Sequence, residues 1–202
     1  MGAANSVGRI VPFARTVGVL SVAVVFLALS GCQYQAVSSV EMQIHQSRLD
    51  KNGLTPLQNY DGVKVTCAPP DRWDKLPANK TLMYTHQQWR SPDRHAGMGV
   101  AYIHLPLPLS AQMVIWFAKS QYSKDQKHQS KAGRLIGEWT DTLGRSWFEA
   151  ENEQYHVKGY AITHGFDAWM VYSGYRVAAH PTADEINLAA KGADSVVPLY
   201  GN

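Results

Sequence analysis

Three tryptophans and two glutamates in the stretch 134–177 are the side chains most suited to binding a ligand. In a four-stranded antiparallel pairing of this stretch, Trp139 lies opposite Trp147, with Trp169 in the same row beyond Thr163. The same face is predicted to carry Glu149 and Glu151 and the small residues Gly137, Gly159, Ala161 and Ser173. Small residues beside indoles would leave a depression with an acidic floor, suited to a peptide, a glycan or a cationic ligand. The alternative is that a helix fills the depression and the indoles belong to the core.

Two histidines and one cysteine are candidates for metal ligands or reactive groups. His86 and His104 are predicted to share one face of a hairpin, but no carboxylate lies among these strand positions to complete a ligand set. Cys67 has the parity of Val63 and Val65. It is therefore expected to point into the core as a small hydrophobic residue, the alternative being a reactive thiol. We expect no metal and no cofactor.

Motifs typical of enzymes are missing from the sequence. There is no G-x-S-x-G, no H-E-x-x-H, no glycine-rich phosphate loop and no paired-cysteine metal motif. Serine, histidine and aspartate all occur, but without a spacing that would define a triad. The sequence therefore predicts no catalytic residues and a protein that is not an enzyme, although an enzyme of unrecognised type stays open as a third hypothesis.

The N-terminus has the three parts of a secretory signal. Arg9 and Arg15 precede an apolar core at 17–29, which small residues follow. At about 1.5 Å per residue this core is too short to cross a hydrocarbon layer of about 30 Å, so cleavage is expected. Leu29-Ser30-Gly31-Cys32 resembles the lipobox of bacterial lipoproteins. That resemblance implies that Cys32 is lipidated, with palmitate among its acyl chains, and becomes the first residue after cleavage.

Two other interpretations of the leader compete with this one. Met1-Gly2 with Ser6 fits an N-myristoylation pattern, but this would leave the apolar core unexplained. The leader could also be an ordinary signal peptide cleaved near a cysteine. Gln33, which follows the cysteine, resembles the pattern of lipoproteins sorted to the outer membrane. The lipoprotein interpretation predicts a bacterial envelope protein anchored by lipid in the outer membrane and facing the periplasm.

Three segments follow from this interpretation: 1–31 as lipoprotein signal peptide, 32–60 as lipidated cysteine and tether, and 61–199 as the folded domain. A tether of that length would reach roughly 30 Å if flexible. Ser38 and Glu41 have capping-box spacing, which favours a short helix over 40–49 within it. Without the two leader arginines the chain keeps 17 basic and 16 acidic residues. That near-neutral balance, with no basic run, argues against nucleic-acid binding.

Further elements are predicted from apolar periodicity and capping signals. Strands are expected at 63–67, 82–89 and 98–105, a helix at 111–123 and a second helix after Pro181. The first helix is expected to begin at Ser110 and to bury Met113, Trp116 and Phe117. The second has capping-box spacing at Thr182 and Glu185. Its predicted inner face is Ile186, Ala189, Ala190, Ala193 and Val197.

Both faces of the four predicted strands are apolar. One face is predicted to hold Ile136, Phe148, Ala150, Tyr160, Ile162, Met170 and Tyr172, and the other Leu135, Trp139, Trp147, Trp169, Val171 and Tyr175. A sheet that is apolar on both sides must be covered on both sides, and the two helices can do this. The expected fold class is α+β: a three-layer α/β/α sandwich around a central, mainly antiparallel sheet.

This order of elements resembles the PsbP-like superfamily, which includes a photosystem II extrinsic protein and a yeast Ran-binding import factor. The resemblance rests on Val63-Lys64-Val65-Thr66-Cys67-Ala68-Pro69-Pro70-Asp71-Arg72-Trp73 and on Val100-Ala101-Tyr102-Ile103-His104-Leu105-Pro106, followed by the strand-rich stretch and the last helix. Members typically act as binding or assembly modules. The resemblance therefore implies a non-catalytic module for an envelope protein partner. The alternative is a binder of a small ligand, peptide or glycan that uses the aromatic face of the sheet.

Overall fold

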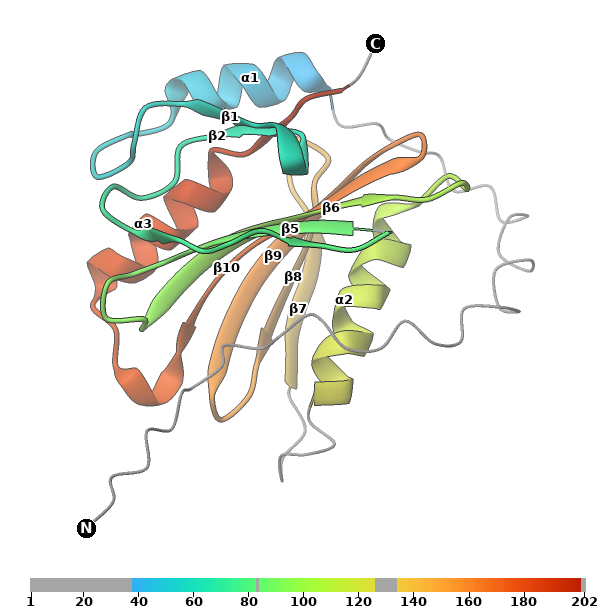
Figure 1. Cartoon of the computed structure of the whole chain (residues 1–202). Helices are drawn as coiled ribbons and strands as arrows, with labels where there is room; N and C mark the ends of the chain where they lie inside the picture. Colours follow the sequence, from blue (N-terminus) through green and yellow to red (C-terminus); the bar gives the residue numbers. More distant parts are fainter. Residues whose placement is uncertain (1–37, 83, 126–133, 201–202) are drawn as a thin grey trace. The chain divides into compact units, whose positions relative to one another are not determined.

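The computed structural model describes residues 38–82, 84–125 and 134–200; the predicted leader and Cys32 lie outside these residues. Figure 1 labels the three helices and most of the strands. The helices are α1 (Ser39–Arg48), α2 (Ala111–Asp125) and α3 (Ala183–Asp194), with 3₁₀ turns η1 (Asp61–Val63) and η3 (Val177–Ala179). The strands are β1 (Gln58–Tyr60), β2 (Val65–Cys67), β3 (Asp74–Lys75), β4 (Asn79–Lys80), β5 (Tyr84–Arg90), β6 (Ala96–His104), β7 (Arg134–Thr140), β8 (Ser146–Glu151), β9 (Tyr155–His164), β10 (Asp167–Arg176) and β11 (Val197–Pro198).

The large sheet has eight strands in the order β3-β5-β6-β10-β9-β8-β7, with β4 also paired to β5. All of its strand pairs are antiparallel. The predicted four-stranded stretch is confirmed as β7 to β10, and Trp139 lies opposite Trp147 as expected. The predicted hairpin is β5 and β6, which the register attaches to β10. The fold class is α+β with mostly antiparallel sheets.

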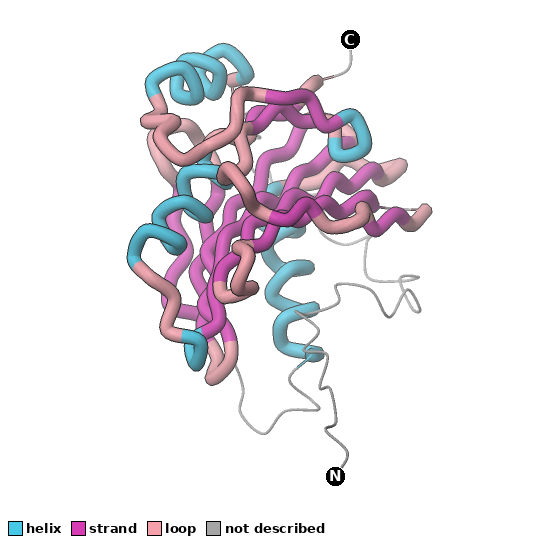
Figure 2. Tube along the Cα trace, turned by 60° about the vertical axis from the view of Figure 1, so that its left-hand side comes forward, coloured by secondary structure: helices cyan, strands magenta, loops and turns pink. Residues whose placement is uncertain are grey.

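Helices pack on both faces of the large sheet, as Figure 2 shows. On one face, α2 covers a core of Leu109, Val114, Ile115, Ala118, Phe148, Ala150, Ala161, Ala168 and Met170. On the other face, α1, α3 and a small sheet of β1, β2 and β11 cover a larger core. Its largest fully buried side chains include Trp169, Tyr160, Met42, Met98 and Ile162. The two cores account for the apolar character of both sheet faces.

The predicted facing of β9 is wrong. Tyr160 pairs with Trp147 on one side and Val171 on the other, so it belongs to the tryptophan face and not to the face of Phe148. Ile162 moves with it, while Gly159 and Ala161 take the opposite face. A change of one residue in register turns every side chain of a strand to the other side. Bulky Tyr160 therefore stands where small residues were expected.

The predicted buried stripe of α2 is also wrong. The helix begins after Ser110, whose hydroxyl accepts a hydrogen bond from the Met113 amide at 3.2 Å, as expected. Its buried side chains, however, are Val114, Ile115 and Ala118. Met113, Trp116 and Phe117 are exposed, Trp116 by 68% of its surface. The sheet beneath the helix presents alanines, so the helix can approach it closely. Val114, Ile115 and Ala118 fit in this narrow space better than the larger Trp116 and Phe117.

Residues 38–60 form part of the folded body and are not a tether. The Ser38 hydroxyl accepts from the Glu41 amide at 3.4 Å, which confirms the start of the short helix α1. Met42 on this helix is buried in the larger core. Gln46 is buried and donates to the Ser195 carbonyl at 2.5 Å. The helix is therefore fixed to the C-terminal part of the chain, and the predicted domain start at residue 61 falls too late.

The C-terminal helix and the small sheet complete this face. Thr182 and Glu185 form the predicted capping box at the start of α3. A β-carbon on Gly192 would lie 2.5 Å from the Met98 sulfur, so the helix approaches the sheet closely. The helix ends at Asp194, and Val197, predicted to continue its inner face, instead lies in β11. The opening strand starts two residues late, at Val65, after a left-handed Lys64.

Candidate functional site

A cavity of about 760 Å³ lies between α3 and the strands β7 to β10, on the tryptophan face of the sheet. We call it the indole cavity. Its lining includes aromatic, cationic and acidic side chains from the sheet and from α3: Trp139, Asp141, Arg145, Trp147, Lys158, Tyr160, Asp184, Leu188, Lys191 and Asp194. A concave site of this size, walled by aromatic rings with a few charged groups, is typical of small-ligand binding.

Two parallel indoles form one wall of the indole cavity. The rings of Trp139 and Trp147 have centroids 5.8 Å apart and planes within 4° of each other. Trp139 is 38% exposed, whereas Trp147 is partly buried and packs against Tyr160 at 4.6 Å. The Trp147 indole N–H donates to Asp141 Oδ2 at 2.8 Å, which fixes the ring. A flat aromatic surface of this kind, held in place before a ligand arrives, reduces the entropy lost on binding.

One ammonium group lies over both indoles. Lys158 Nζ is 5.1 Å from the Trp139 ring centroid and 5.3 Å from that of Trp147, within the range of a cation–π interaction. Lys158 is exposed, and no carboxylate of the described residues lies within ion-pair distance of it. The ammonium group is therefore available at the aromatic wall to form an ion pair with a negatively charged group of a ligand.

Arg145 forms the charged floor of the cavity. Its side chain is only 5% exposed and contacts Asp141 and Asp194, each at 2.6 Å. Its guanidinium also lies 4.6 Å from the Tyr160 ring. Burial alone would raise the pKa of Asp141, but hydrogen bonds from Trp147 and Arg145 lower it below its ordinary value. Two carboxylates thus balance one buried guanidinium, so the floor is a satisfied network and not a bare charge.

The indole cavity brings together only part of the predicted set. Trp139 and Trp147 line it, but Trp169 is fully buried elsewhere and donates its indole N–H to the Val63 carbonyl at 3.0 Å. Glu149 pairs with His156 at 2.8 Å, and Glu151 lies 3.8 Å from Arg134. Neither glutamate lines the cavity. The predicted acidic floor is wrong, and the lining charges are mixed.

Arg145, Lys158 and Tyr160 are lining residues that sequence reasoning missed. Lys158 and Tyr160 were hidden by the reversed facing of β9, because both alternate with Gly159 and Ala161. A signal for Arg145 does exist in the sequence. Asp141 and Arg145 flank the turn between β7 and β8, where a carboxylate can accept from backbone amides and from the arginine together. Their spacing predicts a local ion pair beside Trp139 and Trp147.

The two histidines of the hairpin do not meet. His86 is paired with Ala101 on the α2 face, is buried, and lies 2.7 Å from the Tyr172 hydroxyl. His104 has the parity of Tyr102 on the other face and pairs with Asp167 at 2.7 Å. Burial lowers the pKa of His86 to about 4, so the ring is neutral at physiological pH. The prediction that they share a face is wrong.

Cys67 is fully buried, as its strand parity predicts. Burial raises the pKa of its thiol to about 12, which leaves almost no thiolate at neutral pH. The structure therefore agrees with the prediction of a small hydrophobic residue and gives no support for a reactive thiol.

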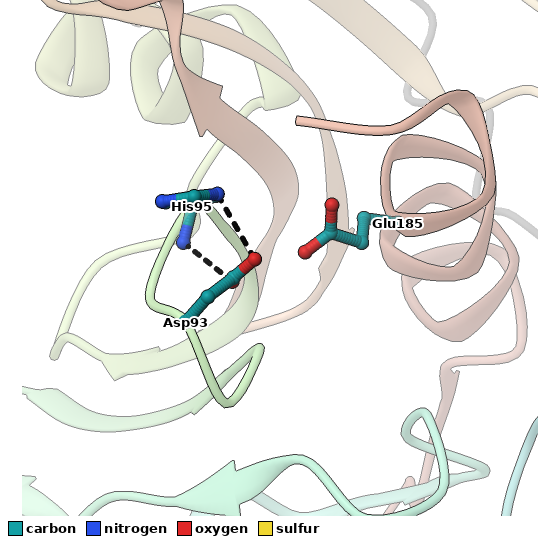
Figure 3. Close-up of side chains that lie close together, drawn as sticks. All are labelled: Asp93, His95 and Glu185. Atoms are coloured by element: carbon teal, nitrogen blue, oxygen red, sulfur yellow. Dashed lines mark hydrogen bonds and ion pairs between the residues drawn. The ribbon is translucent and has the colours of Figure 1, made fainter. Parts of the chain in front are cut away.

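Asp93, His95 and Glu185 form the one group of three potential metal ligands found among the described residues (Figure 3). One ligand atom from each lies within 4.8 Å of the other two. Asp93 Oδ1 accepts from the Ser91 hydroxyl and the His95 amide, at 2.5 and 3.0 Å. Glu185 accepts from Thr182 in the capping box. Both carboxylates thus hold local structure, the β5–β6 loop and the start of α3, which accounts for their positions without a metal.

A second, smaller hollow of about 240 Å³ lies between α2 and β7. Trp116 and Trp139 line it together with Ile115 and Glu138. Strand β7 is the last strand of the sheet, and six of its seven residues are exposed. Exposed Trp116 of α2 therefore lies beside the exposed edge of β7, and we call Trp116 and this edge together the α2–β7 surface.

The comparisons with known proteins identify no family. No family model and no curated protein match this chain. A crystal structure of a protein from Bacteroides thetaiotaomicron VPI-5482 is similar with a TM-score of 0.32 and 10% identity. The match covers 68% of this chain and 47% of that one, so this chain spans about half the length of its structural neighbour. Within the described residues, no helix combines the length and apolarity needed to cross a bilayer.

Proposed function

We propose that this chain is a lipid-anchored bacterial envelope protein that binds an acidic glycan in the indole cavity. The observation that carries the proposal is the Lys158 ammonium over the parallel rings of Trp139 and Trp147. The apolar face of a sugar ring can stack on an indole, and an acidic substituent can pair with the ammonium. The proposal includes no catalytic residue and no cofactor.

The anchor in this proposal is Cys32, acylated after removal of residues 1–31. The described body begins at Ser38, six positions after Cys32, and a fully extended chain of that length spans at most about 20 Å. This is shorter than the reach expected from a tether extending to residue 60. Several acyl chains would make the attachment effectively permanent. The proposed location is the outer membrane, with the body on the periplasmic side.

The finer fold assignment is also part of the proposal. We assign the body to a three-layer α/β/α sandwich of the PsbP-like type. The packing of α2 and α3 on opposite faces of an antiparallel sheet supports it. A binding role without catalysis agrees with that assignment.

Calorimetric titration with trigalacturonic acid, and with neutral maltotriose as the matched control, tests the binding. We expect the acidic trisaccharide to bind and the neutral one to bind at least about tenfold more weakly, the value of one charged hydrogen bond. Trp139→Ala and Lys158→Gln should each weaken binding at least about tenfold. Trp116→Ala, an exposed indole on the other face, should leave it unchanged. Equal affinity for both sugars, or no binding of either, would contradict the proposal.

Metabolic labelling tests the anchor separately. Radiolabelled palmitate is expected to enter the wild-type protein and not the Cys32→Ala variant. Label in both proteins, or in neither, would show that the lipobox-like segment does not direct acylation.

A second candidate function, a module for an envelope protein partner, is favoured by the α2–β7 surface. An exposed strand edge beside a hollow lined by both indoles and polar side chains can accept an extended segment of another protein as an additional strand. A photoreactive amino acid in place of Trp116 should then crosslink one defined envelope protein in living cells. The same amino acid in place of Gln154, an exposed residue at the β8–β9 turn, should not. Identical crosslinks from both positions would argue against a specific surface.

A further inference from the structure

Three exposed apolar side chains gather at one end of the large sheet. Leu82 is fully exposed, and Leu107 and Phe166 each expose 51% of their surface. The strand register places them together: β5 begins opposite the end of β6, whose His104 pairs with Asp167 at the start of β10. Leu82 precedes β5, Leu107 follows β6, and Phe166 lies in the β9–β10 turn. We call these three residues the apolar tip.

Leu107 and Phe166 are held beside each other by the backbone. The Leu105 amide donates to the Phe166 carbonyl at 3.1 Å, and the Leu109 amide donates to the Gly165 carbonyl at 3.4 Å. Pro106 and Pro108 flank Leu107 and restrict its backbone. The two side chains are thus presented outward on braced loops, which lowers the entropy lost when the loops meet another surface.

The polar groups behind the apolar tip are largely satisfied. The Asp167 carboxylate accepts from the Tyr102 hydroxyl at 2.6 Å and lies 2.7 Å from His104. Lys64 lies over the Tyr102 ring at 4.7 Å, and Lys80 is exposed on the neighbouring strand β4. Exposed leucine and phenylalanine side chains, backed by lysines and by polar groups that already have hydrogen-bond partners, suit the interfacial zone of a bilayer.

The described chain begins toward the same end. Gln46, near the end of α1, bonds to Ser195, whereas Tyr200, five residues further on, packs against His164 at the end of β9. Helix α1 contacts β11, which lies between these two points. In Figure 1 the blue start of α1 lies beside the dark red C-terminal segment. Cys32 precedes Ser38 by six residues, and a fully extended chain of that length spans at most about 20 Å.

We propose that the apolar tip contacts the lipid surface and fixes the orientation of the body on the membrane. The inference rests on the proposed acylation of Cys32, and its occupant is the bilayer into which those acyl chains insert. A protein partner fits less well here, because the three side chains project from separate loops, in contrast to the hollow beside Trp116.

Depth-dependent quenching tests this orientation in the full lipoprotein. The variants Leu107→Cys, Phe166→Cys and Gln154→Cys are each labelled with an environment-sensitive fluorophore and reconstituted in phosphatidylethanolamine and phosphatidylglycerol vesicles with brominated acyl chains. Buried Cys67 should not react in the native protein. We expect labels at 107 and 166 to shift to shorter emission wavelength and to be quenched at least about twofold more than the label at 154, at the opposite end of the sheet.

The outcomes separate the two proposals. Protein that floats with the vesicles but shows equal quenching at all three positions is anchored by lipid without using the apolar tip, which overturns this inference alone. Protein that does not float with the vesicles lacks the acyl anchor, and both proposals are then wrong.

Discussion

His86 is the buried group whose ionisation should be visible in the stability of the folded body. Burial lowers its pKa from 6.5 to about 4, and its ring lies against the Tyr172 hydroxyl. Because the unfolded chain takes up this proton first, the stabilisation is complete above pH 6.5 and is lost as the pH falls toward 4. A shift of this size corresponds to about 3 kcal/mol of unfolding free energy.

Urea unfolding at a series of pH values measures this effect. The variant His86→Gln should lose much of the dependence of the unfolding free energy on pH between 4 and 6.5. Val40→Ala, which changes an exposed apolar side chain of α1, should keep the wild-type profile. An unchanged slope in His86→Gln would show that this imidazole becomes protonated within the folded state.

The two cysteines predict a thiol count that depends on the state of the protein. Cys67 is fully buried with a pKa raised to about 12, and Cys32 is the proposed acylation site. Protein purified from the envelope should therefore show no thiol reactive with Ellman's reagent when native and one when unfolded in urea. One reactive thiol in the native protein and two after unfolding would mean that Cys32 carries no lipid.

At the scale of elements, substitutions in α1 test whether the folded body begins with this helix. Met42 is almost fully buried, so Met42→Ala should cost about 2 to 5 kcal/mol of unfolding free energy. Val40→Ala, on the exposed side of the same helix, should change it by less than about 0.5 kcal/mol. Chemical denaturation of both variants makes the comparison. Equal and small effects would indicate that the helix does not pack on the body in solution.

The elements themselves were more predictable than the direction in which they face. Alternation and capping signals located β7 to β10, the hairpin and all three helices. Helix α2, however, has two apolar stripes, and its sequence does not say whether Trp116 or Ile115 points inward. Tertiary packing decides this, because the sheet beneath presents Ala150, Ala161 and Ala168 and leaves little space.

In the candidate site, too, local features were predictable from the sequence and the facing of a strand was not. The turn chemistry of Asp141 and the pairing of Trp139 with Trp147 could be predicted, since both depend on local sequence. The facing of β9 depends on the geometry of the turn at 152–154, and one residue of difference exchanges Lys158 and Tyr160 for Gly159 and Ala161. With Gly159 and Ala161 on the tryptophan face, the sequence predicts a depression with an acidic floor. With Lys158 and Tyr160 there instead, the structure has a cavity with an ammonium group at its aromatic wall.

For the whole molecule, the sheet should be unevenly stable from its centre to its edge. Strand β10 lies between β6 and β9, and its residues from Ala168 to Val171 are buried. Strand β7 pairs on one side with β8, and its other edge belongs to the α2–β7 surface. Central amides should exchange with solvent only through global unfolding, whereas β7 should open locally. Native-state hydrogen exchange measured on peptides covering 134–140 and 167–176 makes this comparison.

We expect the β7 peptide to exchange at least about tenfold faster than the β10 peptide, a difference of roughly 1.4 kcal/mol in opening free energy. Equal protection in the purified protein would mean that a second copy of the chain covers the edge, which light scattering would reveal as a doubled mass. A second outcome is that the amides of β7 exchange quickly in the purified protein and slowly once envelope extract is added. If trigalacturonic acid does not reproduce this protection, the α2–β7 surface is the site that binds a protein partner. Protection by the trisaccharide alone would instead place the response at Trp139 and Trp147, which line both the indole cavity and the smaller hollow.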